Sequence, residues 1–191
     1  MADVLLFHHA HGLTPGVLAF ADDLRHEGHR VHTPDLFDGR RFDRLEQGIA
    51  YADQVGFTEI IDRGVRAAEP LSPAIVYAGF SMGVMPAQKL AQTRFGARGA
   101  LLFHSCVPLA YFGPSWPSDV RVQIHAMEFD PIFVGDGDLE AARALAATTP
   151  NAELFLYPGD QHLFVDRFLP SYDADAAALL LRRAIAFLEA C

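Results

Sequence analysis

Residues 74–83 read Ala-Ile-Val-Tyr-Ala-Gly-Phe-Ser-Met-Gly, and they are the most informative stretch of the chain. A short apolar run leads directly into a Gly-x-Ser-x-Gly turn, and a helical pattern follows the turn to about Phe95. The two glycines allow a strand and a helix to approach closely and allow Ser81 to occupy a strained turn that exposes its hydroxyl. The sequence therefore predicts a strand, a sharp turn and a helix, with Ser81 either a nucleophile or merely a helix-capping serine.

Short apolar runs alternate with longer helical patterns along the whole chain. Strands are expected at Val4–His8, Arg30–Thr33, Ala74–Ala78, Ala100–His104, Val122–Ala126 and Glu153–Tyr157. Helices are expected at Pro15–Glu27, in two pieces within residues 44–69, after Ser81, at Gly137–Thr148 and at about Asp173–Ala190. Strands joined by helical crossovers form a mostly parallel sheet with helices on both faces. We expect an α/β fold of six to seven strands, with residues 1–191 forming a single domain.

Composition narrows the class of protein. The 191 residues are 51% hydrophobic, which excludes a disordered chain, and 15 basic against 24 acidic residues give a net charge of −9. Nucleic acid and anionic membrane surfaces are not expected as partners, because both require clustered Lys and Arg. Cys106 and Cys191 form no disulfide framework, and neither a signal peptide nor a membrane-spanning run is evident. We therefore expect a cytoplasmic protein, and its oligomeric state stays open.

A serine hydroxyl needs a neighbouring imidazole to take its proton and a carboxylate to orient that imidazole. In strand–turn–helix hydrolases these residues follow in the order Ser, Asp or Glu, then His. Three histidines follow Ser81, but His104 and His125 lie in expected strands and are predicted to be satisfied core or sheet residues. His162 follows the last expected strand, so it is the candidate base.

The candidate acid is Asp130, which comes just after the expected strand Val122–Ala126. The carboxyl ends of parallel strands share one edge of the sheet, where active sites of α/β proteins gather. Alternatively, Asp130 is only a turn residue before a proline. Other carboxylates nearby in the sequence are Glu128, Asp136, Asp138 and Asp160.

The loop after the first expected strand contains His8, His9 and His11. Two backbone N–H groups are needed to stabilise an oxyanion, one from Met82 and one from this loop. Three histidines also suggest a metal site, but no His-Glu-x-x-His motif or second ligand cluster accompanies them. We expect polar loop groups at the mouth of a site, and neither a metal nor a cofactor.

The sequence resembles the dienelactone hydrolase family over nearly the whole chain. The similarity rests on His9–Gly12, Gly79–Gly83, the His-x-x-Glu-x-Asp segment His125–Asp130, and Leu156–Gly159 leading to His162. It implies a compact α/β-hydrolase fold without a large cap domain. It also implies that Ser81, Asp130 and His162 form the catalytic triad and that Ala10 and Met82 supply the oxyanion N–H groups.

Three departures separate the chain from the family pattern. Ser81 replaces the usual cysteine, His9 replaces a glutamate, and Asp166 replaces an arginine that binds the substrate carboxylate. We therefore expect a serine hydrolase that cleaves a small ester or lactone through an acyl-enzyme. The alternatives are true dienelactone hydrolysis, a non-catalytic protein that retains the fold, and metal chemistry at the histidine-rich loop.

Expected substrate contacts complete the prediction. Predicted to line the binding pocket are His9, Phe37, Tyr111, Phe112 and Trp116. The net charge, together with Asp160 and Asp166 near His162, predicts a preference for neutral over anionic substrates. Arg40, Arg41 or Arg167 would weaken that preference if they faced the site.

Overall fold

The computed structural model describes residues 1–191 and contains one sheet of six strands in the order β2-β1-β3-β4-β5-β6. Every neighbouring pair of strands is parallel. The strands are β1 (Asp3–Phe7), β2 (Arg30–His32), β3 (Val76–Phe80), β4 (Gly99–Phe103), β5 (Arg121–Met127) and β6 (Ala152–Tyr157). The predicted α/β class is thus confirmed, with six strands from the expected range.

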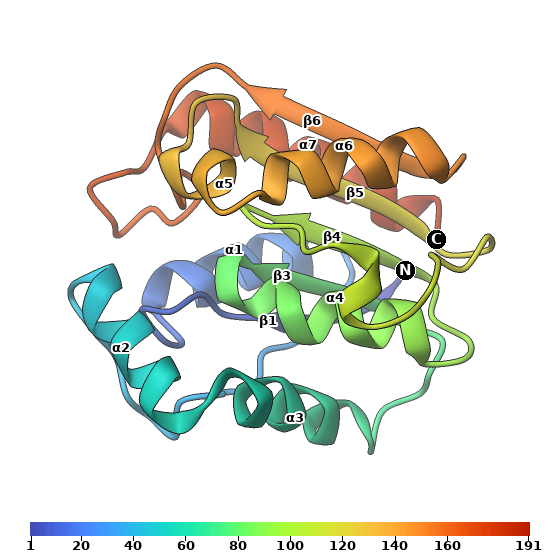
Figure 1. Ribbon diagram of the computed structural model, residues 1–191, viewed down its shortest axis with the longest axis horizontal. Helices are drawn as coiled ribbons and strands as arrows, with labels where there is room; N and C mark the ends of the chain where they lie inside the picture. Colours follow the sequence, from blue (N-terminus) through green and yellow to red (C-terminus); the bar gives the residue numbers. More distant parts are fainter.

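Helices cover both faces of the sheet (Figure 1). They are α1 (Pro15–His26), α2 (Leu45–Val55), α3 (Phe57–Ala68), α4 (Val84–Thr93), α5 (Pro131–Gly135), α6 (Asp138–Thr148) and α7 (Ala174–Glu189). Helices α1 and α7 cover one face, and the other helices contribute to the core on the opposite face. No helix combines the length and the apolar composition that crossing a membrane would require.

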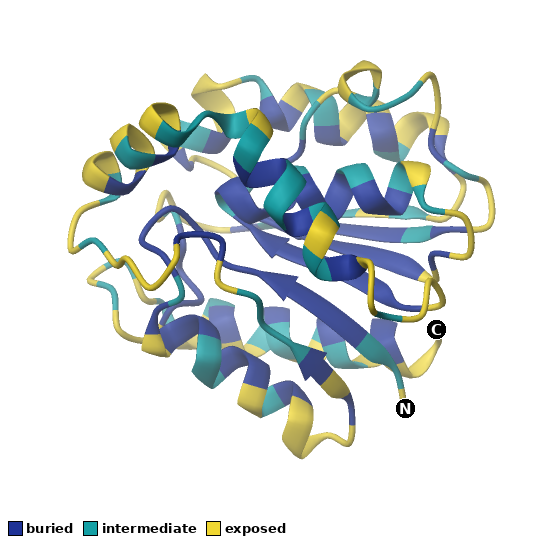
Figure 2. Cartoon of the chain, turned by 90° about the horizontal axis from the view of Figure 1, so that it is seen from below, coloured by how far each residue is buried: buried dark blue, intermediate teal, exposed yellow.

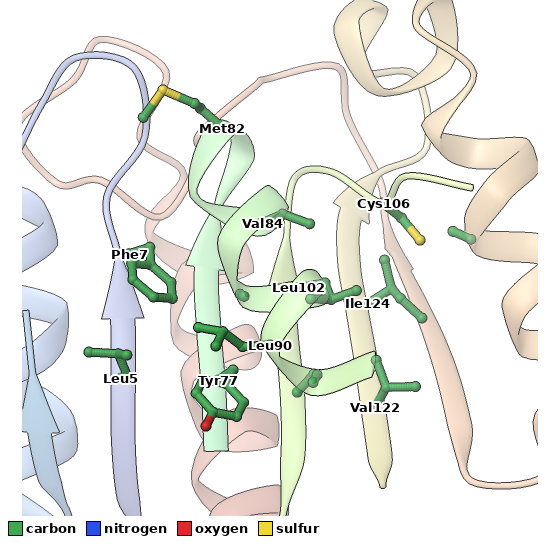
Figure 3. Close-up of a cluster of buried hydrophobic side chains, with 14 of the residues drawn as sticks. Leu5, Phe7, Tyr77, Met82, Val84, Leu90, Leu102, Cys106, Val122 and Ile124 are labelled. Atoms are coloured by element: carbon green, nitrogen blue, oxygen red, sulfur yellow. The ribbon is translucent and has the colours of Figure 1, made fainter. Parts of the chain in front are cut away.

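Two apolar cores flank the strands, and the four central strands β1, β3, β4 and β5 are almost entirely buried (Figure 2). On the α4 side, Leu5, Tyr77, Leu102 and Ile124 project from successive strands beneath the helix (Figure 3). Strands buried on both faces read as continuous apolar runs rather than as alternating patterns. This burial is the reason that short stretches such as residues 99–103 could be recognised as strands from sequence.

The chain changes direction across the sheet at β1, which has β2 on one side and β3 on the other. Loops that follow the two strands at such a point diverge and leave a crevice at the carboxyl edge of the sheet. The loop after β1 carries the histidine-rich segment, and the turn after β3 carries Ser81. The topology therefore brings these two segments together.

One short helix was not expected from the sequence. Helix α5 has five residues, begins with Pro131 and is capped by Asp130, whose side chain accepts hydrogen bonds from Ile132 N and Phe133 N. Proline is favoured in the first turn of a helix, where its missing N–H costs nothing. The turn assigned to Asp130 is thus the start of this helix.

Candidate active site

Ser81 lies in a single 3₁₀ turn (Ser81–Gly83) between β3 and α4, with a backbone φ of 49°. A non-glycine residue in this left-handed region is strained, and such strain is common at functional turns. The two flanking glycines are required by close backbone contacts. A Cβ at Gly79 would collide with the carbonyl of Gly83, and one at Gly83 would lie 2.6 Å from the carbonyl oxygen of Phe7.

His162 and Asp130 complete a chain of hydrogen bonds that begins at Ser81. The Nε2 atom of His162 lies 2.9 Å from Ser81 Oγ, and its Nδ1 atom lies 2.6 Å from Asp130 Oδ2. A carboxylate can only accept, so Nδ1 carries the ring proton and Nε2 accepts from the Ser81 hydroxyl. The arrangement can take the serine proton and hold the resulting imidazolium.

Asp130 is fully buried, and its two oxygens have different partners. Oδ2 accepts from His162, while Oδ1 accepts from the backbone N–H groups of Ile132, at 3.0 Å, and Phe133, at 3.3 Å. These bonds replace the water that the carboxylate loses on burial and fix its orientation. Neither Glu128 nor Asp136, the candidate acids on either side of Asp130 in the sequence, makes a hydrogen bond to His162.

A cavity of about 250 Å³ opens beside Ser81 and His162. Ala10 and Met82 both line it, and the backbone N–H of Ala10 has no hydrogen-bond acceptor within the protein. The remaining apolar lining comes from α2, α3, α4, α5 and the loop after β4: Leu45, Ile49, Ala52, Phe57, Met85, Val107 and Ile132. The polar lining consists of His104, Ser105, Asp136 and Asp138. The cavity thus has an apolar side and an acidic side.

The family to which the chain belongs follows from a match over almost its full length. The model of the dienelactone hydrolase family matches residues 2–191. The chain belongs to the dienelactone hydrolase family. This family places it among hydrolases that act on ester bonds.

Solved structures share the fold of this dienelactone hydrolase family member. A dienelactone hydrolase-like promiscuous phosphotriesterase from metagenomic libraries superimposes with a TM-score of 0.75 at 20% identity, covering 100% of this chain and 86% of that one. An esterase from Pyrobaculum calidifontis gives a TM-score of 0.68 at 16% identity, covering 100% and 76% of the two chains. A search of the curated proteins finds no match.

The aromatic residues predicted as substrate contacts do not line the cavity of this family member. Phe37 is fully buried against Tyr51 and His8, and Trp116 is buried with its indole N–H donated to the carbonyl of Val120. Tyr111 is 66% exposed and contacts Phe112 edge-on. None of these four lines the cavity, and the burial of Phe37 and Trp116 agrees with the tendency of loop aromatic side chains to pack onto the core rather than face a site.

His9 does not line the cavity either. Its ring is buried and lies 3.0 Å from the carboxylate of Asp166, which is itself buried. The other two histidines of the loop are also engaged within the protein: His8 accepts from Leu36 N–H, and His11 lies 2.8 Å from the carbonyl oxygen of Phe42. No three metal-ligating side chains come together in the structure.

His104 and His125, both expected to be core histidines with hydrogen-bond partners, differ in their hydrogen bonding. His125 is buried in β5 and bonded to Tyr157 and Gln123, as expected. His104 is fully buried directly after β4, yet neither ring nitrogen has a partner. Its ring lies 4.8 Å from that of Phe164 and 5.7 Å from that of His162. Burial lowers the pKa of His104 well below its ordinary value, so the ring beside His162 is neutral.

The charges near the site also differ from expectation. Asp166 is buried and bonded rather than exposed at the mouth, and Arg167 forms an ion pair with Asp23. The acidic groups that face the cavity are instead Asp136, which is exposed, and Asp138, whose pKa is raised by burial. No Arg or Lys lines the cavity. Asp136 lies two residues before α6 and Asp138 is its first residue, and their sequence context gave no signal that both would line the cavity.

Proposed function

We propose that the protein is a serine hydrolase that cleaves small neutral carboxylic esters or lactones through an acyl-enzyme. The observation that carries the proposal is the continuous hydrogen-bond chain from Ser81 through His162 to Asp130, situated at one end of a cavity. The strained φ of Ser81 supports it further, because a purely capping serine has no need of that conformation.

In the acylation step, Nε2 of His162 removes the proton from Ser81 as Oγ attacks the substrate carbonyl carbon. The imidazolium is stabilised by the buried carboxylate of Asp130. The oxyanion of the tetrahedral intermediate accepts hydrogen bonds from the N–H groups of Ala10 and Met82. Loss of one such donor costs an enzyme of this kind about 3 kcal/mol of transition-state stabilisation.

His162 then donates its proton to the leaving alkoxide, which departs as an alcohol, or stays attached to the acyl group if the substrate is a lactone. In the second half of the reaction, Nε2 takes a proton from water, and the hydroxide attacks the acyl carbon. Collapse of this intermediate returns the proton to Ser81 Oγ and releases the carboxylic acid. Every proton transfer uses the same imidazole, and no cofactor takes part in the scheme.

The cavity supports the choice of substrate. Its volume of about 250 Å³ suits a small acyl or alkoxy group, and most of its lining is apolar. Asp136 and Asp138 are the only Asp, Glu, Lys or Arg residues that line it. An anionic dienelactone would be repelled by them and would find no arginine or lysine to bind its carboxylate. The neutral ester is therefore preferred over true dienelactone hydrolysis.

Labelling with a fluorophosphonate tests the proposal. The expected result is one adduct on the peptide that contains Ser81, no adduct in Ser81→Ala, and slow labelling in His162→Ala. A protein that retains the fold only for binding would give no adduct at Ser81 and no ester hydrolysis. An adduct at another residue would contradict the assignment of the nucleophile.

A further inference from the structure

A second buried histidine–carboxylate pair lies outside the Ser81–His162–Asp130 chain. Nε2 of His9 is 3.0 Å from Oδ2 of Asp166, and both residues are at most 2% exposed. The two residues are 157 positions apart in the sequence, so the fold alone brings them together. Nothing in the proposed reaction gives either of them a chemical step.

The hydrogen bonds around His9 fix where its ring proton lies. The backbone N–H of His11 donates to Nδ1 of His9 at 3.3 Å, so Nδ1 is unprotonated. The proton is therefore on Nε2 and is donated to Asp166. Burial lowers the pKa of His9 to about 4, which keeps the ring neutral near neutral pH.

Asp166 occupies a site that suits a fixed carboxylate. Oδ2 also accepts from Thr14 Oγ1 at 2.7 Å, and Oδ1 accepts from the backbone N–H of Phe168 at 2.9 Å. Thr14 is the N-cap of α1, and a Cβ at Gly16 would collide with the Asp166 carboxylate. The carboxylate thus lies against the positive end of α1, which favours its ionised form. These hydrogen bonds lower the pKa of Asp166 despite its burial.

The pair joins two loops, the one that carries Ala10 and the one that carries His162, and the proposed reaction requires these loops to keep a fixed relative position. His9 immediately precedes Ala10, which lines the cavity and whose N–H has no acceptor within the protein, and Asp166 follows His162 by four residues. The loop of Ala10 is also confined from the other side, because a Cβ at Gly48 of α2 would collide with the Ala10 carbonyl. Movement of this loop relative to His162 would therefore require the His9–Asp166 bond to break.

We propose that His9 and Asp166 form a positioning pair, which holds the Ala10 N–H in place relative to the imidazole of His162. The inference rests on the proposed function, because it assigns the pair to the oxyanion and proton-transfer geometry of that reaction. The oxyanion forms only in the transition state. A misplaced N–H donor therefore lowers kcat and leaves the affinity for the neutral ester almost unchanged.

The test measures kcat and KM on an activated neutral ester, with kcat expressed per site titrated by fluorophosphonate. His9→Phe removes the bond to Asp166, and we expect kcat to fall roughly 10- to 100-fold with little change in KM. His9→Gln places an amide N–H where Nε2 lies, so it should recover most of the lost kcat. Asp166→Asn, which is isosteric, provides a second variant if His9→Phe does not fold. In the double variant, the loss of transition-state stabilisation should be smaller than the sum of the losses in His9→Phe and Asp166→Asn.

Asp173→Ala is the matched control for a general loss of stability. It removes the N-cap of α7, a helix whose cap accepts from Asp175 N and Ala176 N and makes no contact with the cavity. It should lower Tm and leave kcat per titrated site at the wild-type value. A wild-type kcat per titrated site in both His9→Phe and Asp166→Asn would overturn the positioning role and leave the proposed function intact. A wild-type protein that neither labels nor hydrolyses esters would overturn both.

Discussion

One carboxylate joins His162 to the start of a helix: Asp130 receives the Nδ1–H of His162 on Oδ2 and caps α5 with Oδ1. Because α5 is only five residues long, its cap and its proline define where it begins. The position of the proposed acid is therefore set by the helix that it starts. The two tasks can be separated experimentally, since they use different oxygen atoms.

Asp130→Asn is expected to lose activity while the fold is retained. Asn is as good a helix cap as Asp, so the free energy of unfolding should change little through α5. The imidazole would lose its orienting anion, and kcat should fall by about 10⁴-fold. Measuring kcat together with urea unfolding separates the two effects.

Asp130→Ala removes the cap as well as the acid. It should lose the same activity and, in addition, about 1 kcal/mol of stability. Asp136→Asn is the matched control, because Asp136 lies at the other end of α5 and makes no hydrogen bond to His162. Retention of activity in Asp130→Asn with loss in Asp136→Asn would assign the acid to the later residue.

Ser81→Ala and His162→Ala should each abolish most ester hydrolysis. Residues that act as one unit lose nearly the whole effect when any member is removed, so each variant should fall by about 10⁴-fold or more in kcat. Circular dichroism would check that both variants remain folded. Wild-type turnover in His162→Ala, with the chemical step rate-limiting, would show that another group is the base.

Neutral esters should have a higher kcat/KM than matched analogues that carry a carboxylate. A unit charge about 4 Å from a substrate carboxylate costs roughly 1 kcal/mol in a water-like medium, or about fivefold, and more where water is excluded. Asp136→Asn and Asp138→Asn should narrow the gap, and so should added salt, most strongly for the exposed Asp136. A preference for the anionic ester at both low and high salt would instead favour true dienelactone hydrolysis.

Stability should fall as the pH drops below neutrality, because three buried histidines resist protonation. Burial lowers the pKa of His9 to about 4 and that of His125 to about 3, and it lowers the pKa of His104 well below its ordinary value. Below about pH 6.5 the unfolded chain binds protons at these side chains while the folded protein does not. The free energy of unfolding is therefore highest above pH 6.5 and decreases progressively as the pH falls toward 4.

His104→Phe isolates one of these contributions, since neither ring nitrogen of His104 makes a hydrogen bond that would be lost. The slope of the unfolding free energy against pH between 6.5 and 4.5 should decrease by up to about 1.4 kcal/mol per pH unit. Urea unfolding at half-unit pH intervals would measure it. An unchanged slope would mean that His104 is protonated in the folded state.

The order of elements, the break between α2 and α3 and the sharp turn at Ser81 could be predicted because each depends on neighbouring residues. Apolar runs mark buried strands, Gly56 with φ 93° ends one helix and begins the next, and paired glycines mark the turn. The order Ser81, Asp130, His162 could be read as a hypothesis for the same reason, since each follows the carboxyl end of a strand. Strand ends in a parallel sheet meet at one edge whatever the loops do.

The surroundings of those residues depended on the tertiary structure. The contact between His9 and Asp166, the apolar wall from α2 and the burial of Phe37 and Trp116 all join segments distant in the sequence. A loop side chain gains similar free energy from packing on the core or lining a cavity, and only the docking of neighbouring elements decides between them. His104 shows the limit most clearly: its sequence context indicates a core histidine, but only the fold could reveal that no partner reaches its ring.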